Sequence, residues 1–67
     1  MTTWAIAVAQ LRHLTGLTQE QLARELGVTV SSVNRWENGH ALPIPLARIA
    51  LRSLAQQWEV RDLQWPA

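Results

Sequence analysis

The chain has 67 residues, no cysteine and a formal net charge of +1 at pH 7, and its length fits a single small domain. The lack of cysteine excludes a disulfide framework and a thiolate metal site, and no apolar run reaches the roughly 18 residues of a membrane span. The N-terminus also lacks the basic and apolar segments of a signal peptide, so we expect a soluble cytoplasmic protein.

The first predicted helix covers residues 3–14, TWAIAVAQLRHL. Its apolar side chains recur at helical spacing and would share one face: Trp4, Ala7, Val8, Leu11 and Leu14. Thr3 is a suitable N-terminal cap for this helix, and Gly16 is suited to end it.

The second predicted helix begins at a capping box. Thr18 is the cap and Gln21 is the third residue after it, so each side chain can bond the other residue's backbone N–H. Leu17 and Leu22 flank this box at the positions of a hydrophobic staple. The helix is expected to end at Gly27, because glycine readily adopts the left-handed conformation that follows a helix.

The third predicted helix covers about residues 30–37, with Thr29 as its cap and Asn38-Gly39 as its end. The second helix ends at Gly27, so only a very short turn separates the two helices. Such a turn sets the helices at a steep angle, which is the helix-turn-helix arrangement.

The fourth predicted helix runs from about Pro45 to Trp58, since proline suits a first helical turn. It carries two adjacent apolar stripes, one of Leu46, Ile49 and Ala50 and the other of Ala47, Leu51, Leu54 and Trp58. A surface helix normally needs one such stripe, so the other is surplus. The sequence thus predicts an all-α domain over residues 1–60 with four helices, or five if the tail, residues 61–67, adds one.

The third helix presents two different faces. Steps of about 100° per residue place Val33 and Trp36 toward the core. The opposite side carries Ser31 and Arg35, flanked by Ser32 and Asn34, and Val30 lies near the rim at the N-terminal end. A polar outward face is often merely solvated, but serine and asparagine favour helices less than the glutamate and lysine usual there. Arginine can pair with guanine and asparagine with adenine, so we favour DNA reading over a solvated face.

The stretch LTQEQLARELGVTVSSVNRWENG, residues 17–39, resembles the helix-turn-helix of the lambda-repressor-like (Cro/CI, XRE) family of bacterial and phage regulators. The matching positions are Gln19, Ala23, Gly27, Val33 and the closing run Trp36-Glu37-Asn38-Gly39. This resemblance implies a compact lambda-repressor-like fold and a sequence-specific transcription regulator, such as a repressor. Its third helix would enter the major groove of double-stranded DNA.

The resemblance also implies the contact residues. Bases would be contacted by Val30, Ser31 and Arg35, with Asn34 as an addition. Phosphates would be contacted by Thr18, Gln19, Ser32, Asn38 and His40, together with the backbone around Gly39. Many relatives carry a long polar residue where this chain has Val30, and valine can touch a thymine methyl group but cannot form a hydrogen bond.

Several arginines have more than one interpretation. By the resemblance, Arg12 forms a salt bridge with Glu37, joining the first helix to the end of the third. Arg24 is expected to be solvated. Arg48 and Arg52 are four residues apart on the fourth helix, where they would either form a solvated face or contact a DNA backbone or a partner.

The surplus apolar stripe has two explanations as well. Either the tail covers it, through Leu63 or Trp65, or a second copy of the chain does. We favour a homodimer, with Leu51, Leu54 and Trp58 at its interface, because a chain with so few cations should bind DNA weakly as one copy.

No catalytic constellation is present, and His13 and His40 lie far apart in the sequence without a carboxylate pattern beside them. We therefore expect neither enzymatic activity nor a metal or other cofactor. The alternative function is a protein-interaction module, such as an antitoxin-like partner, which would dock through the apolar tail LQWPA. DNA binding would then be secondary.

Overall fold

The computed structural model describes residues 2–66, so Met1 and Ala67, the ends of the predicted domain and tail, lie outside the described residues. Four helices are present in this range: α1 (Trp4–Thr15), α2 (Gln19–Leu26), α3 (Val30–Glu37) and α4 (Pro45–Gln57). The all-α class expected from the sequence is confirmed. Residues 61–66 form no helix, so the described part of the tail does not add a fifth.

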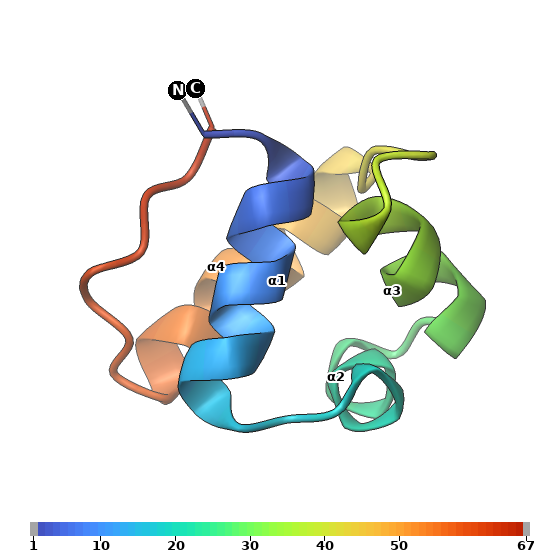
Figure 1. Ribbon diagram of the computed structural model, residues 1–67. Coiled ribbons are helices and arrows are strands. Elements are labelled where there is room, and N and C mark those ends of the chain that lie inside the picture. The colour runs from blue at the N-terminus through green and yellow to red at the C-terminus, as the bar shows by residue number, and fades with distance from the viewer. Residues whose placement is uncertain (1, 67) are drawn as a thin grey trace.

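The four helices enclose one core. In Figure 1, α1 lies across the middle of the molecule with α4 behind it, while α2 and α3 cover one side. Each helix contributes buried apolar side chains to a single cluster, among them Val8, Leu11, Leu22, Val33, Trp36 and Leu51. No helix within residues 2–66 is long and apolar enough to cross a membrane.

Local capping explains where the helices begin. The Thr3 hydroxyl accepts a hydrogen bond from the backbone N–H of Ile6, at 3.2 Å. At the start of α2 the predicted capping box is complete, because Thr18 accepts from the Gln21 N–H at 3.1 Å and the Gln21 side chain accepts from the Thr18 N–H at 2.9 Å. Thr29 caps α3 without such a reciprocal bond, and its hydroxyl accepts from the Ser32 N–H at 3.1 Å.

The turn between α2 and α3 is as short as the sequence predicts. Gly27 has a φ of 73°, in the left-handed region that favours glycine, and the Val28 N–H donates to the Ala23 carbonyl at 3.0 Å. Ala23 itself is buried. Its small side chain is compatible with close packing of the helices around it.

A bidentate ion pair joins α1 to the end of α3, as predicted. Arg12 Nε lies 2.7 Å from Glu37 Oε2, and Arg12 Nη2 donates to Glu37 Oε1 at 3.0 Å. The Glu37 side chain is 9% exposed and that of Arg12 is 31% exposed. The hydrogen bonds to Glu37 raise the pKa of Arg12, which outweighs the desolvation that lowers it.

Two residues of α4 that were predicted to form a dimer interface are buried in the core. Leu51 is 0% exposed and Leu54 is 4% exposed, because both side chains fill the core of the single chain. Their assignment to a dimer interface is therefore wrong. Trp58, the third residue of that assignment, is 44% exposed, and the surplus stripe is instead the one that carries Leu46 and Ile49, at 73% and 62% exposure.

The chain after α4 returns along the molecule to a point near Thr2, where the Thr2 hydroxyl donates to Gln64 Oε1 at 3.4 Å (Figure 1). Val60, Leu63 and Trp65 pack against the core on the way. The rings of Trp65 and Trp4 have centroids 5.7 Å apart. The tail thus covers part of the domain's apolar surface.

Two arginines of α4 complete this packing. The guanidinium of Arg48 lies 5.1 Å from the ring centroid of Trp4, and Arg48 Nε donates to the Pro43 carbonyl at 2.8 Å. The guanidinium of Arg52 lies 5.6 Å from the ring of Trp4 and 5.9 Å from that of Trp65. The sequence did not predict this stacking of both cations on tryptophan rings, and Arg52 is at the same time exposed to solvent, as one of its expected roles requires.

Replacing Arg12 by alanine should lower the free energy of unfolding by about 1–3 kcal/mol, because it leaves a nearly buried carboxylate with fewer partners. The matched control is Arg24→Ala, on the exposed surface of α2, which should change stability by less than about 0.5 kcal/mol. Urea unfolding of both variants, of Glu37→Ala and of the Arg12/Glu37 double variant measures the coupling. Strictly additive losses in the double variant would show that the pair does not interact.

Replacing Trp65 by alanine should lower the free energy of unfolding by about 1–2 kcal/mol, because it removes one ring of the stacked pair and a platform for Arg52. Trp58→Ala removes the same side chain from a position that is 44% exposed and should cost less. Thermal unfolding followed by circular dichroism compares the two variants. Equal losses would argue against a stabilising role for the tail.

Candidate nucleic-acid interface

The outward face of α3 carries the predicted base-reading residues. Val30 is 46% exposed, and Ser31, Asn34 and Arg35 are exposed as well. Val33 and Trp36, on the opposite side of the helix, are buried in the core. Burial of the inner face fixes the rotation of α3 about its axis, so these outward side chains are held on the surface.

Asn34 belongs to a hydrogen-bond network that links α3 to α2. Its Nδ2 donates to Gln19 Oε1 at 3.3 Å, and its Oδ1 accepts from Asn38 Nδ2 at 3.1 Å. Gln19 Nε2 donates in turn to Glu37 Oε1 at 3.2 Å. Three predicted DNA-contact residues are thus brought together and attached to the Arg12–Glu37 ion pair.

Sequence reasoning missed this network. The spacing of Asn34 and Asn38 contained a signal, because side chains four residues apart are neighbours on a helix. The bonds to Gln19 had no such signal, since Gln19 lies on another helix. Each of these side-chain amides can still form further hydrogen bonds, because an NH2 group has two donor hydrogens and a carbonyl oxygen has two lone pairs.

The N-terminus of α2 offers donors for a phosphate. The backbone N–H groups of Gln19 and Glu20 have no hydrogen-bond acceptor within residues 2–66. Thr18 is exposed, and its hydroxyl accepts from Gln21 but can still donate its own hydrogen. A helix N-terminus also carries a partial positive charge, which suits an anion.

At the C-terminus of α3, the backbone N–H groups that were expected to contact a phosphate are already hydrogen-bonded within the chain. The Gly39 N–H donates to the Trp36 carbonyl at 3.1 Å, and the His40 N–H donates to the Arg35 carbonyl at 2.9 Å. Gly39 has a φ of 74°, so these bonds form the usual C-terminal cap. The backbone donors predicted to contact phosphate are therefore already used, and contact here would come from the exposed side chains of Asn38 and His40.

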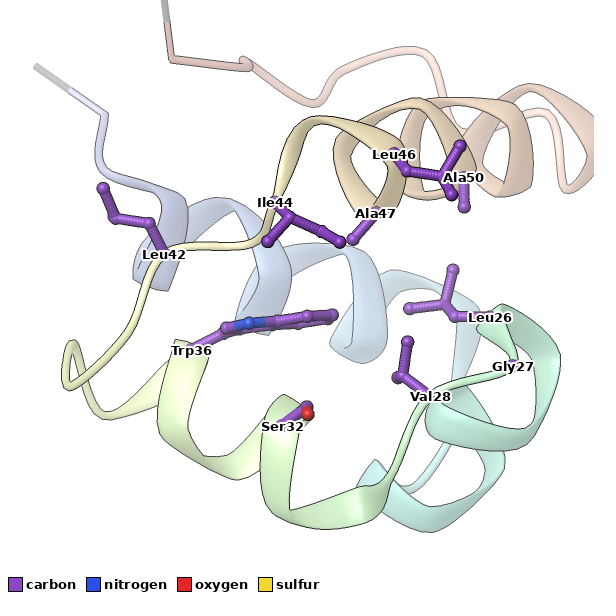
Figure 2. Close-up of a pocket in the computed structure, with 10 residues that line it drawn as sticks. All are labelled: Leu26, Gly27, Val28, Ser32, Trp36, Leu42, Ile44, Leu46, Ala47 and Ala50. Carbon is purple, nitrogen blue, oxygen red and sulfur yellow. The ribbon is translucent and has the colours of Figure 1, made fainter.

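Ser32 does not lie with the other predicted phosphate contacts. It is half-buried, its hydroxyl is 3.0 Å from that of Thr29, and it lines an apolar hollow together with Trp36 (Figure 2). The hollow is on the side of α3 that faces the start of α4, whereas Asn34 and Gln19 meet on the side that faces α2. This position gives no support to a phosphate contact by Ser32.

Comparison with known protein families assigns this chain to one of them. Residues 8–51, from within α1 to within α4, match a helix-turn-helix family model, and this range includes the whole outward face of α3. Neither a curated protein nor a solved structure matches the chain. The matched range covers more than half of the chain, and it includes the two capped helices α2 and α3 and the short turn between them. The chain therefore belongs to the lambda-repressor-like (XRE) helix-turn-helix family of DNA-binding regulators.

Proposed function

We propose that this protein is a sequence-specific transcription regulator that inserts α3 into the major groove of DNA. The observation that carries the proposal is the exposed face of Val30, Ser31, Asn34 and Arg35, on a helix whose opposite side is anchored in the core. A major groove about 12 Å wide admits one α-helix. Family membership supports a regulator of bacterial or phage origin that acts in the cytoplasm.

The base-reading residues differ in what they can recognise. Arg35 can donate two parallel hydrogen bonds to guanine O6 and N7, and Ser31 can donate or accept one. Val30 can contact a thymine methyl group. Asn34 can pair with adenine through its remaining amide hydrogen and lone pair, and its bonds to Gln19 and Asn38 orient it before DNA arrives.

The proposed phosphate contacts lie at two helix ends beside this face. Thr18 and Gln19 would bind one phosphate at the N-terminus of α2, supported by the unpaired backbone N–H groups there. Asn38 and His40 would bind another at the C-terminal end of α3. Phosphate contacts of this kind position a protein on the duplex, and the bases then decide the sequence.

The outward face of α3 carries a single arginine, so one copy gains little from counterion release. We therefore propose that the regulator binds as a homodimer. A two-fold dimer requires an inverted-repeat operator, with half-sites about 34 Å apart, one helical turn.

The alternative of a protein-interaction module rested on the tail. Trp65 stacks on Trp4, and Leu63 packs against the core, so the described part of the tail is engaged within the domain. Docking a partner through these side chains would require breaking that packing. The structure thus offers no observation that favours the tail as a docking element.

Selection of bound sequences from random duplex DNA tests the function, and recovery of one inverted-repeat motif is the expected result. On that motif Arg35→Ala should cost about 1–3 kcal/mol in binding and relax the preference at one base pair. Arg24→Ala removes an exposed arginine of α2 and should leave the preference unchanged. An unaltered preference profile for the Arg35 variant would remove Arg35 from the readout.

Gln19→Ala should weaken binding to the selected motif and to unrelated DNA by similar factors, because phosphate contacts do not specify sequence. The dependence of affinity on salt should hardly change, since glutamine is neutral and releases few counterions. Gln10→Ala, at an exposed position on α1, is the control and should bind normally. A loss confined to the selected motif would show that Gln19 acts through Asn34 and not through a phosphate.

A further inference from the structure

A run of exposed apolar side chains lies beside α3. Four large side chains within eight residues of sequence are each about two thirds exposed: Leu42 at 67%, Ile44 at 65%, Leu46 at 73% and Ile49 at 62%. They belong to the loop before α4 and to its first turns, and we call them the 42–49 surface. Leu42, Ile44 and Leu46 help to line a hollow of about 380 Å³. Figure 2 shows these three side chains, with Trp36 below them.

We propose that the 42–49 surface is the site where a second copy of this chain docks, about a two-fold axis. This inference rests on the proposed function, since it names the interface of the dimer that would bind an inverted repeat. Soluble monomers rarely expose apolar patches of this kind without a partner.

The chemistry of the hollow favours a protein surface over a small ligand. Ligand pockets place a few polar groups that orient the bound molecule. Here no charged side chain lines the hollow, and its polar side-chain groups are the indole N–H of Trp36 and the hydroxyl of Ser32, which already lies 3.0 Å from the hydroxyl of Thr29.

The distribution of charge favours a second copy as the occupant. In a two-fold interface each residue near the axis meets its own equivalent, so a charge there would be repelled by an identical charge. The one ionisable residue of this segment, Arg48, is turned away onto Trp4 and the Pro43 carbonyl. The centre of the 42–49 surface is thus free of charge, as the centres of homodimer interfaces tend to be.

The shape of the surface is compatible with reciprocal packing. Projecting side chains, Leu42 and Leu46, lie next to the hollow, so a projection on one copy can enter the hollow of the other. A standard interface buries about 800 Å² per partner, less than a fifth of the 4580 Å² that the chain exposes. The occupant would lie alongside α3 on its Ser32 side, which leaves Ser31 and Arg35 open to DNA.

Two other exposed apolar residues, both on α1, are less suited to self-association. Ile6 and Leu14 on α1 surround a hollow whose lining includes Arg12, His13 and Asp62. Pairing two copies across this hollow would bury charged groups. Leu14, which is 57% exposed, therefore serves as the matched control position.

The test uses Leu46→Glu. Leu46 is the second residue of α4, where a carboxylate interacts favourably with the helix dipole, so the variant should fold as the wild type does. Sedimentation at micromolar concentration should give a dimer for the wild type and for Leu14→Glu, and a monomer for Leu46→Glu. Leu46→Arg should also be monomeric alone, and an equimolar mixture with Leu46→Glu should restore a one-to-one dimer that weakens with salt.

A monomeric wild type, both free and on a two-site duplex, would overturn the proposal, as would a Leu46→Glu variant that remains dimeric. DNA binding separates this failure from failure of the proposed function. Leu46→Glu should bind a single half-site normally and the full inverted repeat about a hundredfold more weakly than the wild type. A dimeric wild type that selects no DNA sequence would refute the regulator while leaving the interface intact.

Discussion

The carboxylate of Glu37 is the contact on which the arrangement of α1, α2 and α3 depends. It accepts hydrogen bonds from Arg12 on α1 and from Gln19 at the start of α2, while it is itself attached to the last turn of α3. Its side chain is only 9% exposed, and a carboxylate so poorly solvated requires its partners. Because Gln19 also accepts a hydrogen bond from Asn34, the same carboxylate that joins three helices helps to orient an amide on the proposed DNA-reading face. Fold stability and site geometry are therefore coupled through one charged group.

Several of the six arginines of this chain pack against other parts of the domain. Arg12 is held by Glu37, and Arg48 and Arg52 stack on tryptophan rings, so half of the six arginines serve packing between segments distant in sequence. The outward face of α3 keeps Arg35. Under the proposed function, this distribution of arginines would give little nonspecific attraction to phosphates, so affinity would have to come from base contacts and from the pairing of two copies. The proposed contact through the 42–49 surface is consistent with that requirement, since it would join two copies without covering the proposed reading face.

The sequence predicted the features that depend on neighbours along the chain. Thr3, Thr18 and Thr29 begin helices because each hydroxyl accepts a hydrogen bond from the backbone N–H three residues further on. Gly27 ends α2 because it accepts a positive φ. The inward direction of Val33 and Trp36 was equally predictable, because α3 is short and has one apolar side. Only the Arg12–Glu37 pair lay beyond such local rules, and the family resemblance supplied it.

Only the tertiary structure shows which of the two apolar stripes of α4 faces the core. On α4 the spacing places Leu46 and Leu51 on different stripes, but both stripes are apolar, so the pattern cannot say which one faces inward. The rotation of the helix against α1 and α2 buries Leu51 and exposes Leu46. The stacking of Arg52 on Trp4 and Trp65 and the bond from Asn34 to Gln19 were likewise invisible in the sequence. Local sequence thus determined where each helix begins and ends and which side of α3 faces outward. Contacts between distant segments determined which stripe of α4 is exposed and which side chains meet across helices, because only packing fixes how one helix is turned toward another.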